Sequence, residues 1–466
     1  MTIDDLQYFL LPANFTKHKW DAAALLSLKN QWQNLPPSWG NSTDPCGAHW
    51  DGVDCDINSR VTQLVLSTTN LKGTLGSDIA ELSELKSFAL AGCSFSGRIP
   101  GEIGNLANLS FLALNSNNVS GKIPASLGNL SNLNWLDLAD NQLTGRLPVS
   151  TKSTPGLDLL LKAKHFHFNK NQQTGSIPPK LFSFKMVLIH VILNENQLTG
   201  EIPSTLGVVK TLEILWFGAN CSPLVNSRLD RNSLNGTVPS NLNNLTSLNE
   251  LHLANNLLTG PVPDLTGMNL LNYVDLSNNS FDPSEAPKWF STLQSLRALG
   301  MENGKLHGVV PQKLFNLPQL QQVLLKDNTF NGTLAMGGNI GQQLQLVDFE
   351  NNQISAVTLR FSYKMIIILK GNPACVGALS NTSFCQLVQE PQELIPNSTS
   401  LPDCGSKSCA SNEKLNPQNC ECAYPNHGSK GVLLHAQVEI LYSDVDLQGL
   451  KLPLKKKDAA GGSWVA

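Results

Sequence analysis

Four cysteines near the C-terminal end form the densest group of reactive side chains in the sequence. They follow the spacing Cys404-x4-Cys409-x10-Cys420-x-Cys422. Four thiols allow three disulfide pairings, and closely spaced bridges exchange more readily when they are strained. Three interpretations therefore stay open: two structural disulfides, a redox-responsive disulfide pair, or a structural zinc site, whose usual C-x2-C spacing this pattern fits poorly.

A second group consists of aromatic rings, histidines and aspartates that recur through the middle of the chain. Rigid aromatic rings on one surface are good anchors for a peptide or a protein domain. Imidazoles also bind transition metals, but His165, His167 and His190 have no carboxylate or thiol at matching height in the pattern, so we expect no metal. The group comprises Phe111, Trp135, Asp137, His165, His167, His190, His252, Tyr273 and Asp275.

These residues belong to a repeated segment with the template L-x-x-L-x-L-x-x-N-x-L-x-G-x-[IL]-P. The template recurs at intervals of about 24 residues, which is typical of leucine-rich repeats. Clear copies begin at Leu109, Leu133, Leu188 and Leu248. The asparagine position holds Asn117, Asn141, Asn171, Asn196, Asn256, Asn279, Asn328, Asn352 and Asn372, with Thr69, Cys93 and Gly304 in divergent copies.

The template has a direct physical meaning. Its leucines point into the coil from a short strand, and the residues between them face solvent on a concave wall. The asparagine amide at the bend pairs with backbone groups that would otherwise be buried without partners. One copy cannot bury its leucines alone, so the copies must stack without a break. The sequence therefore predicts an α/β repeat fold: a plant-type, right-handed leucine-rich-repeat solenoid of about 13 turns with cysteine-capped ends.

Two stretches break the repeat. Residues 149–165 lengthen one copy and are expected to form a loop or a short helix on the convex side. Around residues 216–227 two registers fit: deleting these residues restores LEILRLDRNSLNGTVP, whereas LEILWFGAN matches the template by itself and ends at Asn220. Either register completes the turn and leaves roughly twelve residues as an inserted loop. We prefer a retained intron over a functional loop as the explanation.

Cysteine pairs are expected to close both ends of the solenoid. A helical segment, Ala22–Gln33, precedes the first pair, and Trp50 is expected to cover the open end of the stack. Each small disulfide loop would stabilise the fold by about 2–3 kcal/mol. The pairs are Cys46 with Cys55 and Cys375 with Cys385.

Positions 3 and 5 of the template place the aromatic and histidine group on neighbouring strands of the concave wall. We expect exposed Trp and Tyr rings there to anchor a peptide, a small-molecule ligand or a partner protein domain. Titration of the imidazoles would make that affinity depend on pH across the acidic range. A solvated wall with incidental aromatic residues is the alternative.

Composition excludes several classes of protein. The net charge is −3 and charged residues make up 15% of the chain, which argues against nucleic acid or an anionic membrane as partner. No apolar run is long enough for a transmembrane helix, and the N-terminus lacks the basic region of a signal peptide. Serine-hydrolase, zinc-protease and kinase motifs are missing too, so we expect neither an enzyme nor a cofactor.

Several stretches resemble plant leucine-rich-repeat receptor-like kinases. They are DPCGAHWDGVDC at the N-terminal cap and repeats ending LTGEIP; TPGLDLLLKAKHFHFNKN, VLIHVILNENQLTGEIP and the ending CECAYP resemble subfamily VIII more narrowly. The resemblance covers about residues 20–425. It implies a plasma-membrane receptor with an extracellular ligand-binding region and a cytoplasmic Ser/Thr kinase, which this chain does not contain. The ligand would then be extracellular, with a co-receptor as a further partner. Some members of this group have been linked to sensing extracellular oxidants, which adds to the alternative of a hydrogen peroxide sensor acting through the C-terminal cysteines. A soluble inhibitor or decoy that uses the same concave wall is a further alternative.

The predicted organisation is an N-terminal segment (1–18), an N-terminal cap (19–58), the solenoid (59–373), a C-terminal cap (374–388), a linker with the four-cysteine cluster (389–425), and a tail (426–466) that looks truncated or misjoined. N-x-[ST] sequons suggest a glycosylated surface in a secreted protein. The candidates are Asn108, Asn118, Asn129, Asn235, Asn244, Asn278, Asn331, Asn381 and Asn397.

Overall fold

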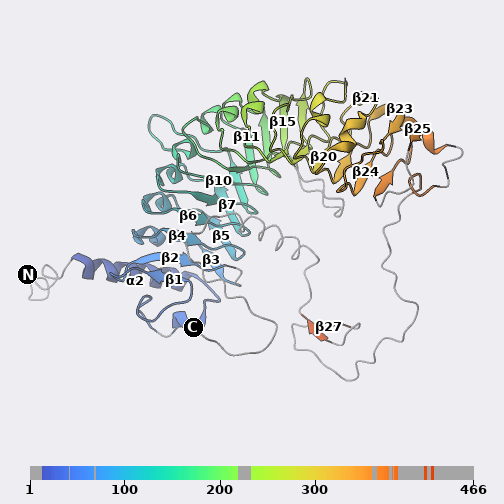
Figure 1. Ribbon diagram of the computed structural model, residues 1–466. Coiled ribbons are helices and arrows are strands. Elements are labelled where there is room, and N and C mark those ends of the chain that lie inside the picture. Colours follow the sequence, from blue (N-terminus) through green and yellow to red (C-terminus); the bar gives the residue numbers. More distant parts are fainter. Residues whose placement is uncertain are drawn as a thin grey trace, which may run out of the picture. The chain divides into compact units, whose positions relative to one another are not determined.

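Thirteen parallel turns stack in sequence order in the computed structural model, as the colours of Figure 1 show. The structure describes residues 13–40, 42–67, 70–218, 232–358, 365–376, 380, 382–386, 414–416 and 421–423. The predicted leucine-rich-repeat solenoid is therefore confirmed. Its core is one continuous column of leucines, because each turn buries its apolar side chains against the turns on both sides.

The L-x-x-L-x-L segments form one long sheet, which we call the concave sheet because it corresponds to the concave wall predicted from the sequence. Only its first strand is antiparallel to its neighbour. Its strands, in spatial order, are β1 (Val53–Cys55), β2 (Val61–Val65), β4 (Ser87–Ala89), β6 (Phe111–Ala113), β8 (Trp135–Asp137), β10 (His165–His167), β12 (His190–Ile192), β14 (Ile214–Trp216), β16 (Glu250–His252), β18 (Tyr273–Asp275), β20 (Ala298–Gly300), β22 (Gln322–Leu324), β24 (Leu346–Asp348) and β26 (Ile366–Ile368).

Shorter parallel ladders follow the bend of each turn. The first comprises β3 (Lys72–Thr74), β5 (Ser94–Arg98), β7 (Asn118–Lys122), β9 (Gln142–Gly145), β11 (Gln172–Ser176), β13 (Gln197–Gly200), β15 (Ser233–Thr237) and β17 (Leu257–Thr259). The second comprises β19 (Ser284–Glu285), β21 (Leu306–Gly308), β23 (Thr329–Ala335) and β25 (Gln353–Thr358).

Short 3-10 helices complete the turns, and most begin directly after the template proline, whose fixed φ starts the helix. They are η2 (Ser77–Glu81), η3 (Gly101–Asn105), η4 (Ala125–Asn129), η5 (Leu157–Leu159), η6 (Pro179–Leu181), η7 (Ser204–Val208), η8 (Ser240–Asn244), η9 (Lys288–Ser291) and η10 (Gln312–Asn316). The lengthened copy at 149–165 contains only the short helix η5 before its strand.

The buried asparagines form what we call the asparagine ladder, and Asn171 illustrates it. Its Nδ2 donates to the carbonyl of Leu138 in the preceding turn at 2.9 Å and to that of Phe168 in its own turn at 3.2 Å. Its Oδ1 accepts from the backbone N–H of Leu143 at 2.9 Å. The members with this pattern are Asn117, Asn141, Asn171, Asn196, Asn232, Asn256, Asn279, Asn328, Asn352 and Asn372.

The residue before a ladder position takes a left-handed backbone conformation wherever the structure describes that residue. Ser116, Lys170 and Glu195, for example, have φ of 56°, 53° and 54°. A non-glycine residue pays a conformational penalty there. The several hydrogen bonds of the adjacent asparagine offset that penalty, so the bend and the ladder depend on each other.

The interrupted copy combines parts of both predicted registers. Leu212, Leu215 and Phe217 are buried, and Trp216 ends β14, as LEILWFGAN predicts. The ladder position, however, is filled by Asn232 rather than Asn220, because Asn232 Nδ2 donates to the carbonyls of Leu193 and Phe217. Residues 219–231 lie outside the described residues.

The N-terminal cap is attached to the first turn by a buried ion pair. Helix α2 (Ala13–Gln31) carries Asp21, whose carboxylate accepts from Arg60 Nε at 2.8 Å and from the backbone N–H of Val61 at 2.9 Å. The helix ends before the predicted Gln33, because Gln33 exchanges backbone hydrogen bonds with Lys72 instead. Trp50 is buried and stacks on Trp39 of the 3-10 helix η1 (Pro37–Gly40), and these rings close the open end of the stack.

Both predicted cap disulfides are present. Cys46 is bonded to Cys55 in the N-terminal cap, and Cys375 is bonded to Cys385 after the 3-10 helix η11 (Pro373–Cys375). A separate unit, residues 389–466, contains the antiparallel strands β27 (Lys414–Asn416) and β28 (Glu421–Ala423). Cys404, Cys409 and Cys420 lie outside the described residues, as does the side chain of Cys422.

We expect Asn171→Ala to lower the free energy of unfolding by about 2–4 kcal/mol, because buried backbone carbonyls and an N–H would lose their partners. Chemical denaturation followed by circular dichroism measures the change. Gln142→Ala, at an exposed position of β9, is the matched control and should shift stability by less than about 0.5 kcal/mol. Equal effects of the two substitutions would contradict a structural role for the ladder.

Candidate binding site on the concave sheet

Two rows of side chains lie on the solvent side of the concave sheet, because the first and third residues of each strand point the same way. In-register pairing aligns each row across neighbouring strands. The first row runs through Phe111, Trp135, His165, His190, Ile214, Glu250 and Tyr273, and the second through Ala113, Asp137, His167, Ile192, Trp216, His252 and Asp275. All nine predicted wall residues lie in these rows, and their role in binding stays a prediction.

Five rings from four consecutive strands make up what we call the first aromatic cluster: Phe111, Trp135, His165, His167 and His190. Phe111 stacks on Trp135 with ring centroids 5.6 Å apart, and Trp135 packs on His165 at 4.0 Å. His190 lies edge-on to His165 at 4.5 Å and parallel to His167 at 5.6 Å. The rings form one contiguous patch.

A second aromatic cluster follows on β14, β16 and β18 and consists of Trp216, Glu250, His252 and Tyr273. His252 stacks on Tyr273 with centroids 4.2 Å apart and packs against Trp216 at 4.8 Å. Glu250 accepts a hydrogen bond from Trp216 Nε1 at 3.1 Å. The second cluster therefore includes an acidic side chain, whereas the first consists of rings alone.

The expectation of freely exposed anchors is wrong for Trp135, which is only 5% exposed. His165 and His167 are 8% and 2% exposed, because large rings on adjacent strands cover one another even on the solvent side. Phe111, His190, Trp216 and Tyr273 are half-buried and form the accessible surface of the two clusters.

Each of the two aspartates of the second row accepts a backbone hydrogen bond within its own turn. Asp137 Oδ1 accepts from the backbone N–H of Ala139 at 3.0 Å, and Asp275 Oδ1 accepts from that of Ser277 at 3.1 Å. Asp275 is 1% exposed, so direct contact with a ligand would require its turn to open. The other Asp137 oxygen, Oδ2, lies 3.6 Å from His167 Nδ1.

Burial governs the protonation of the first aromatic cluster. Desolvation, followed by repulsion from His190, His167 and Lys164, lowers the pKa of His165 from 6.5 to about 2. Desolvation and then His167 lower the pKa of His190 to about 3. Their Nδ1 atoms are 3.1 Å apart and share a hydrogen bond, which requires one of the two to be a lone-pair acceptor. The expected titration across the mildly acidic range is therefore wrong for these two histidines.

Trp216 joins the site although it was not among the predicted wall residues, whereas Glu250 lies at template position 3, where the pattern places a wall residue. Trp216 falls in the interrupted copy, where two registers competed. The signal was present nonetheless, because LEILWFGAN places Trp216 at template position 5. Choosing that register for the strand alone would have identified it.

The glycosylation candidates divide by exposure. Asn108, Asn118, Asn129, Asn235, Asn244 and Asn331 are exposed. Asn278 is half-buried and donates to Asn255 Oδ1 at 3.1 Å, so a glycan there would break an existing contact. Asn381 and Asn397 lie outside the described residues.

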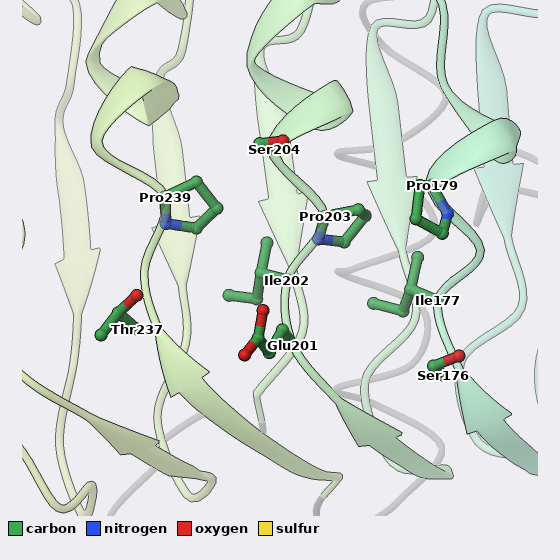
Figure 2. Close-up of a pocket in the computed structure, with 9 residues that line it drawn as sticks. All are labelled: Ser176, Ile177, Pro179, Glu201, Ile202, Pro203, Ser204, Thr237 and Pro239. Carbon is green, nitrogen blue, oxygen red and sulfur yellow. The ribbon is translucent and has the colours of Figure 1, made fainter.

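A shallow pocket of about 510 Å³ lies off the concave sheet, where β11, β13 and β15 lead into η6, η7 and η8. Figure 2 shows prolines of three successive turns, Pro179, Pro203 and Pro239, along its lining. Glu201 is the only ionisable residue of its lining. The pocket is a groove between adjacent repeats whose lining residues do not suggest a catalytic or metal site. Its lining is Ser176, Ile177, Pro179, Glu201, Ile202, Pro203, Ser204, Thr237 and Pro239.

Comparison with protein families identifies both parts of this architecture. Residues 18–56 match the leucine rich repeat N-terminal domain, and residues 108–130 and 132–153 match the Leucine Rich Repeat model. A probable leucine-rich repeat receptor-like protein kinase of Arabidopsis thaliana is 43% identical over 437 residues, which cover 88% of this chain and 44% of that relative.

Two solved structures share the fold. A crystal structure of PEPR1–AtPEP1 is 30% identical with a TM-score of 0.63, covering 76% of this chain and 48% of that one. The leucine-rich-repeat ectodomain of the Arabidopsis thaliana receptor kinase GASSHO1/SCHENGEN3, in complex with CASPARIAN STRIP INTEGRITY FACTOR 2, is 27% identical with a TM-score of 0.64 and covers 76% and 41%. This chain thus spans less than half the length of each of these three proteins.

Acidification should lower the free energy of unfolding through His165 and His190. The urea midpoint is measured in the presence of EDTA. Unfolded histidines take up protons below pH 6.5, whereas these folded ones do so only near pH 2–3, so stability falls as the pH drops below 6.5. Each contributes up to about 1.4 kcal/mol per pH unit. The His165→Gln/His190→Gln variant should show a shallower fall in urea midpoint between pH 7 and pH 4.

Exposed His307 on β21 provides the control, because His307→Gln should leave the pH dependence of the urea midpoint unchanged. Parallel pH profiles for the double variant and this control would show that the two cluster histidines titrate normally in the folded chain.

Proposed function

This chain belongs to the leucine-rich-repeat proteins and is related over most of its length to a plant receptor-like kinase, and on that premise we propose that it forms the extracellular recognition region of such a receptor. Its partner is a peptide or protein that binds across the two aromatic clusters of the concave sheet. The receptor acts at the plasma membrane, with this region on the extracellular side. Assignment to subfamily VIII stays a prediction.

The relatives support the receptor part of the proposal. The sequence relative is a receptor-like kinase, and one of the two structural relatives is a receptor ectodomain in complex with its partner. Both cap disulfides fit an oxidising compartment outside the cell. No helix among the described residues is long and apolar enough to cross a bilayer.

The observation that carries the binding part is the contiguity of the rings. Phe111, Trp135 and His165 stack across three neighbouring strands, so their positions are set by the sheet and by each other. Because the rings are already held in place, this chain loses little side-chain entropy when a partner covers them, and that loss is one of the costs of using flexible side chains as anchors.

The two clusters differ in charge, which constrains the partner. Glu250 on β16 lies beside the half-buried rings of Trp216 and Tyr273, and exposed Glu213 directly precedes the neighbouring strand β14, which ends at Trp216. A cationic side chain placed there would meet both a carboxylate and aromatic faces. The first cluster offers the apolar ring of Phe111 and the imidazoles of His165 and His190, whose pKa values lie far below 6.5. We therefore expect the partner to carry a basic residue near the second cluster and an apolar residue near the first.

The oxidant-sensing alternative depends on Cys404, Cys409, Cys420 and Cys422, which lie outside the described residues except for the backbone of Cys422 in β28. The decoy alternative uses the same wall as a receptor and differs from it only in parts beyond this chain. No observation on the described residues favours either alternative, and the receptor function remains our conclusion.

Peptides selected by display against the intact, secreted chain provide the test. Trp216→Ala and Tyr273→Ala should each weaken the selected peptides by about 10-fold or more, since truncating an aromatic anchor typically costs more than 1 kcal/mol. Surface plasmon resonance measures the affinities, and thermal unfolding confirms that the variants fold.

Phe184→Ala is the matched control, because Phe184 is 77% exposed and lies outside the concave sheet. It should leave the affinities unchanged. Selected peptides that ignore the two cluster substitutions but respond to Phe184→Ala, or a library that yields no binder, would overturn the proposed function.

A further inference from the structure

We propose that His165, His167 and His190 form a binding site for a divalent transition-metal ion such as Zn²⁺ or Cu²⁺, with Asp137 positioning His167. The inference rests on the geometry of these four side chains. It does not depend on the proposed peptide partner, although the site lies within the first aromatic cluster.

The three histidines converge from strands β10 and β12, which pair in register so that His165 lies opposite His190. One ring nitrogen from each lies within 4.8 Å of the other two. The Nδ1 atoms of His165 and His190 are 3.1 Å apart. Two nitrogens bound tetrahedrally to one zinc ion at 2.0–2.1 Å are about 3.3 Å apart, so this pair already has nearly the required separation.

Asp137 supplies a carboxylate beside the three histidines, where the sequence analysis expected none. It lies opposite His167 in the register of β8 and β10, and its Oδ2 is 3.6 Å from His167 Nδ1. Metal-bound histidines usually direct their second nitrogen to a carboxylate in this way. The other nitrogen, His167 Nε2, is buried and makes no hydrogen bond to any described residue, so it is available as a ligand.

The surroundings suit a metal held by neutral imidazoles. Trp135 packs on the His165 ring at 4.0 Å and restricts its rotation, whereas His190 is half-buried and leaves the group open to the solvent side of the sheet. Three protein ligands with one open position are typical of reactive or exchangeable zinc sites rather than closed structural ones. Lys164, whose positive charge opposes protonation of His165, is exposed to solvent.

The ligand type determines which metals the site would take. Imidazole nitrogens favour Zn²⁺, Cu²⁺ and Ni²⁺, whereas Mg²⁺ and Ca²⁺ require oxygen ligands. The open position would accept water or a donor group from a bound partner. The site would thus add a metal-dependent contact to a wall that is otherwise aromatic.

Isothermal titration of the intact, EDTA-treated and dialysed chain with Zn²⁺ tests the proposal. We expect one equivalent that is lost in the His165→Gln/His167→Gln/His190→Gln variant, while Mg²⁺ gives no heat of binding. Asp137→Asn should weaken this equivalent by about 10- to 100-fold, as expected for the partner of a metal-bound histidine. Cu²⁺ electron paramagnetic resonance of the unmutated chain should show coupling to at least three nitrogens.

Two controls separate this site from other metal ligands in the chain. His307→Gln removes an exposed histidine on β21, and Cys420→Ser/Cys422→Ser removes two cysteines of the C-terminal cluster; both should retain the histidine-dependent equivalent. Zinc binding that survives the triple histidine variant, or that disappears only with the cysteines, would overturn the proposal. The nitrogen coupling in the unmutated chain keeps the test valid if the triple variant misfolds.

Peptide binding measured in EDTA distinguishes the two proposals. Peptides that bind at the aromatic clusters while the chain takes up no Zn²⁺ would overturn the metal site alone. One histidine-dependent equivalent of Zn²⁺ without peptide binding would overturn the proposed recognition function alone.

Discussion

The asparagine ladder is the interaction on which the rest of this molecule depends. Each turn must bend sharply after its strand, and the bend leaves backbone carbonyls and N–H groups inside the solenoid. Asn171 satisfies carbonyls of Leu138 and Phe168 and the N–H of Leu143, which ties two turns together at the point of greatest strain. Without this pairing, the left-handed residue before each asparagine would have nothing to offset its conformational cost.

The ladder also fixes the register of the concave sheet, and the register creates the candidate site. Residues some 25 to 30 positions apart, such as Trp135, His165 and His190, become neighbours because every turn starts its strand at the same height. The interrupted copy shows how strongly this holds. Asn232 takes the ladder position although residues 219–231 separate it from the end of the described strand segment, and β14 still pairs in register with both neighbours.

Placing large rings on the solvent side of a sheet changes their chemistry as well as their exposure. Strands about 4.8 Å apart force adjacent rings into contact, so the histidines bury one another and Trp135 becomes part of a packed layer. Desolvation then holds the pKa of His165 and of His190 far below 6.5. The same packing that removes them from acid–base chemistry leaves neutral nitrogens facing each other, an arrangement suited to a shared ligand.

The repeat template in the sequence was sufficient to establish the solenoid, the ladder asparagines of the regular copies and the strand positions of the wall residues, because each follows from a local pattern repeated every turn. The close spacing of the cysteines outside the repeats predicted both cap disulfides. The sequence did not reveal the burial of Trp135, the suppressed titration of His165 and His190, or the 3.6 Å distance from Asp137 Oδ2 to His167 Nδ1, although the template placed these two residues at the same position of consecutive copies. Those properties arise between turns, from the volume of one ring against the next. Only the tertiary structure decides them, because stacking distance and solvent access depend on neighbours that lie a full repeat away in the chain.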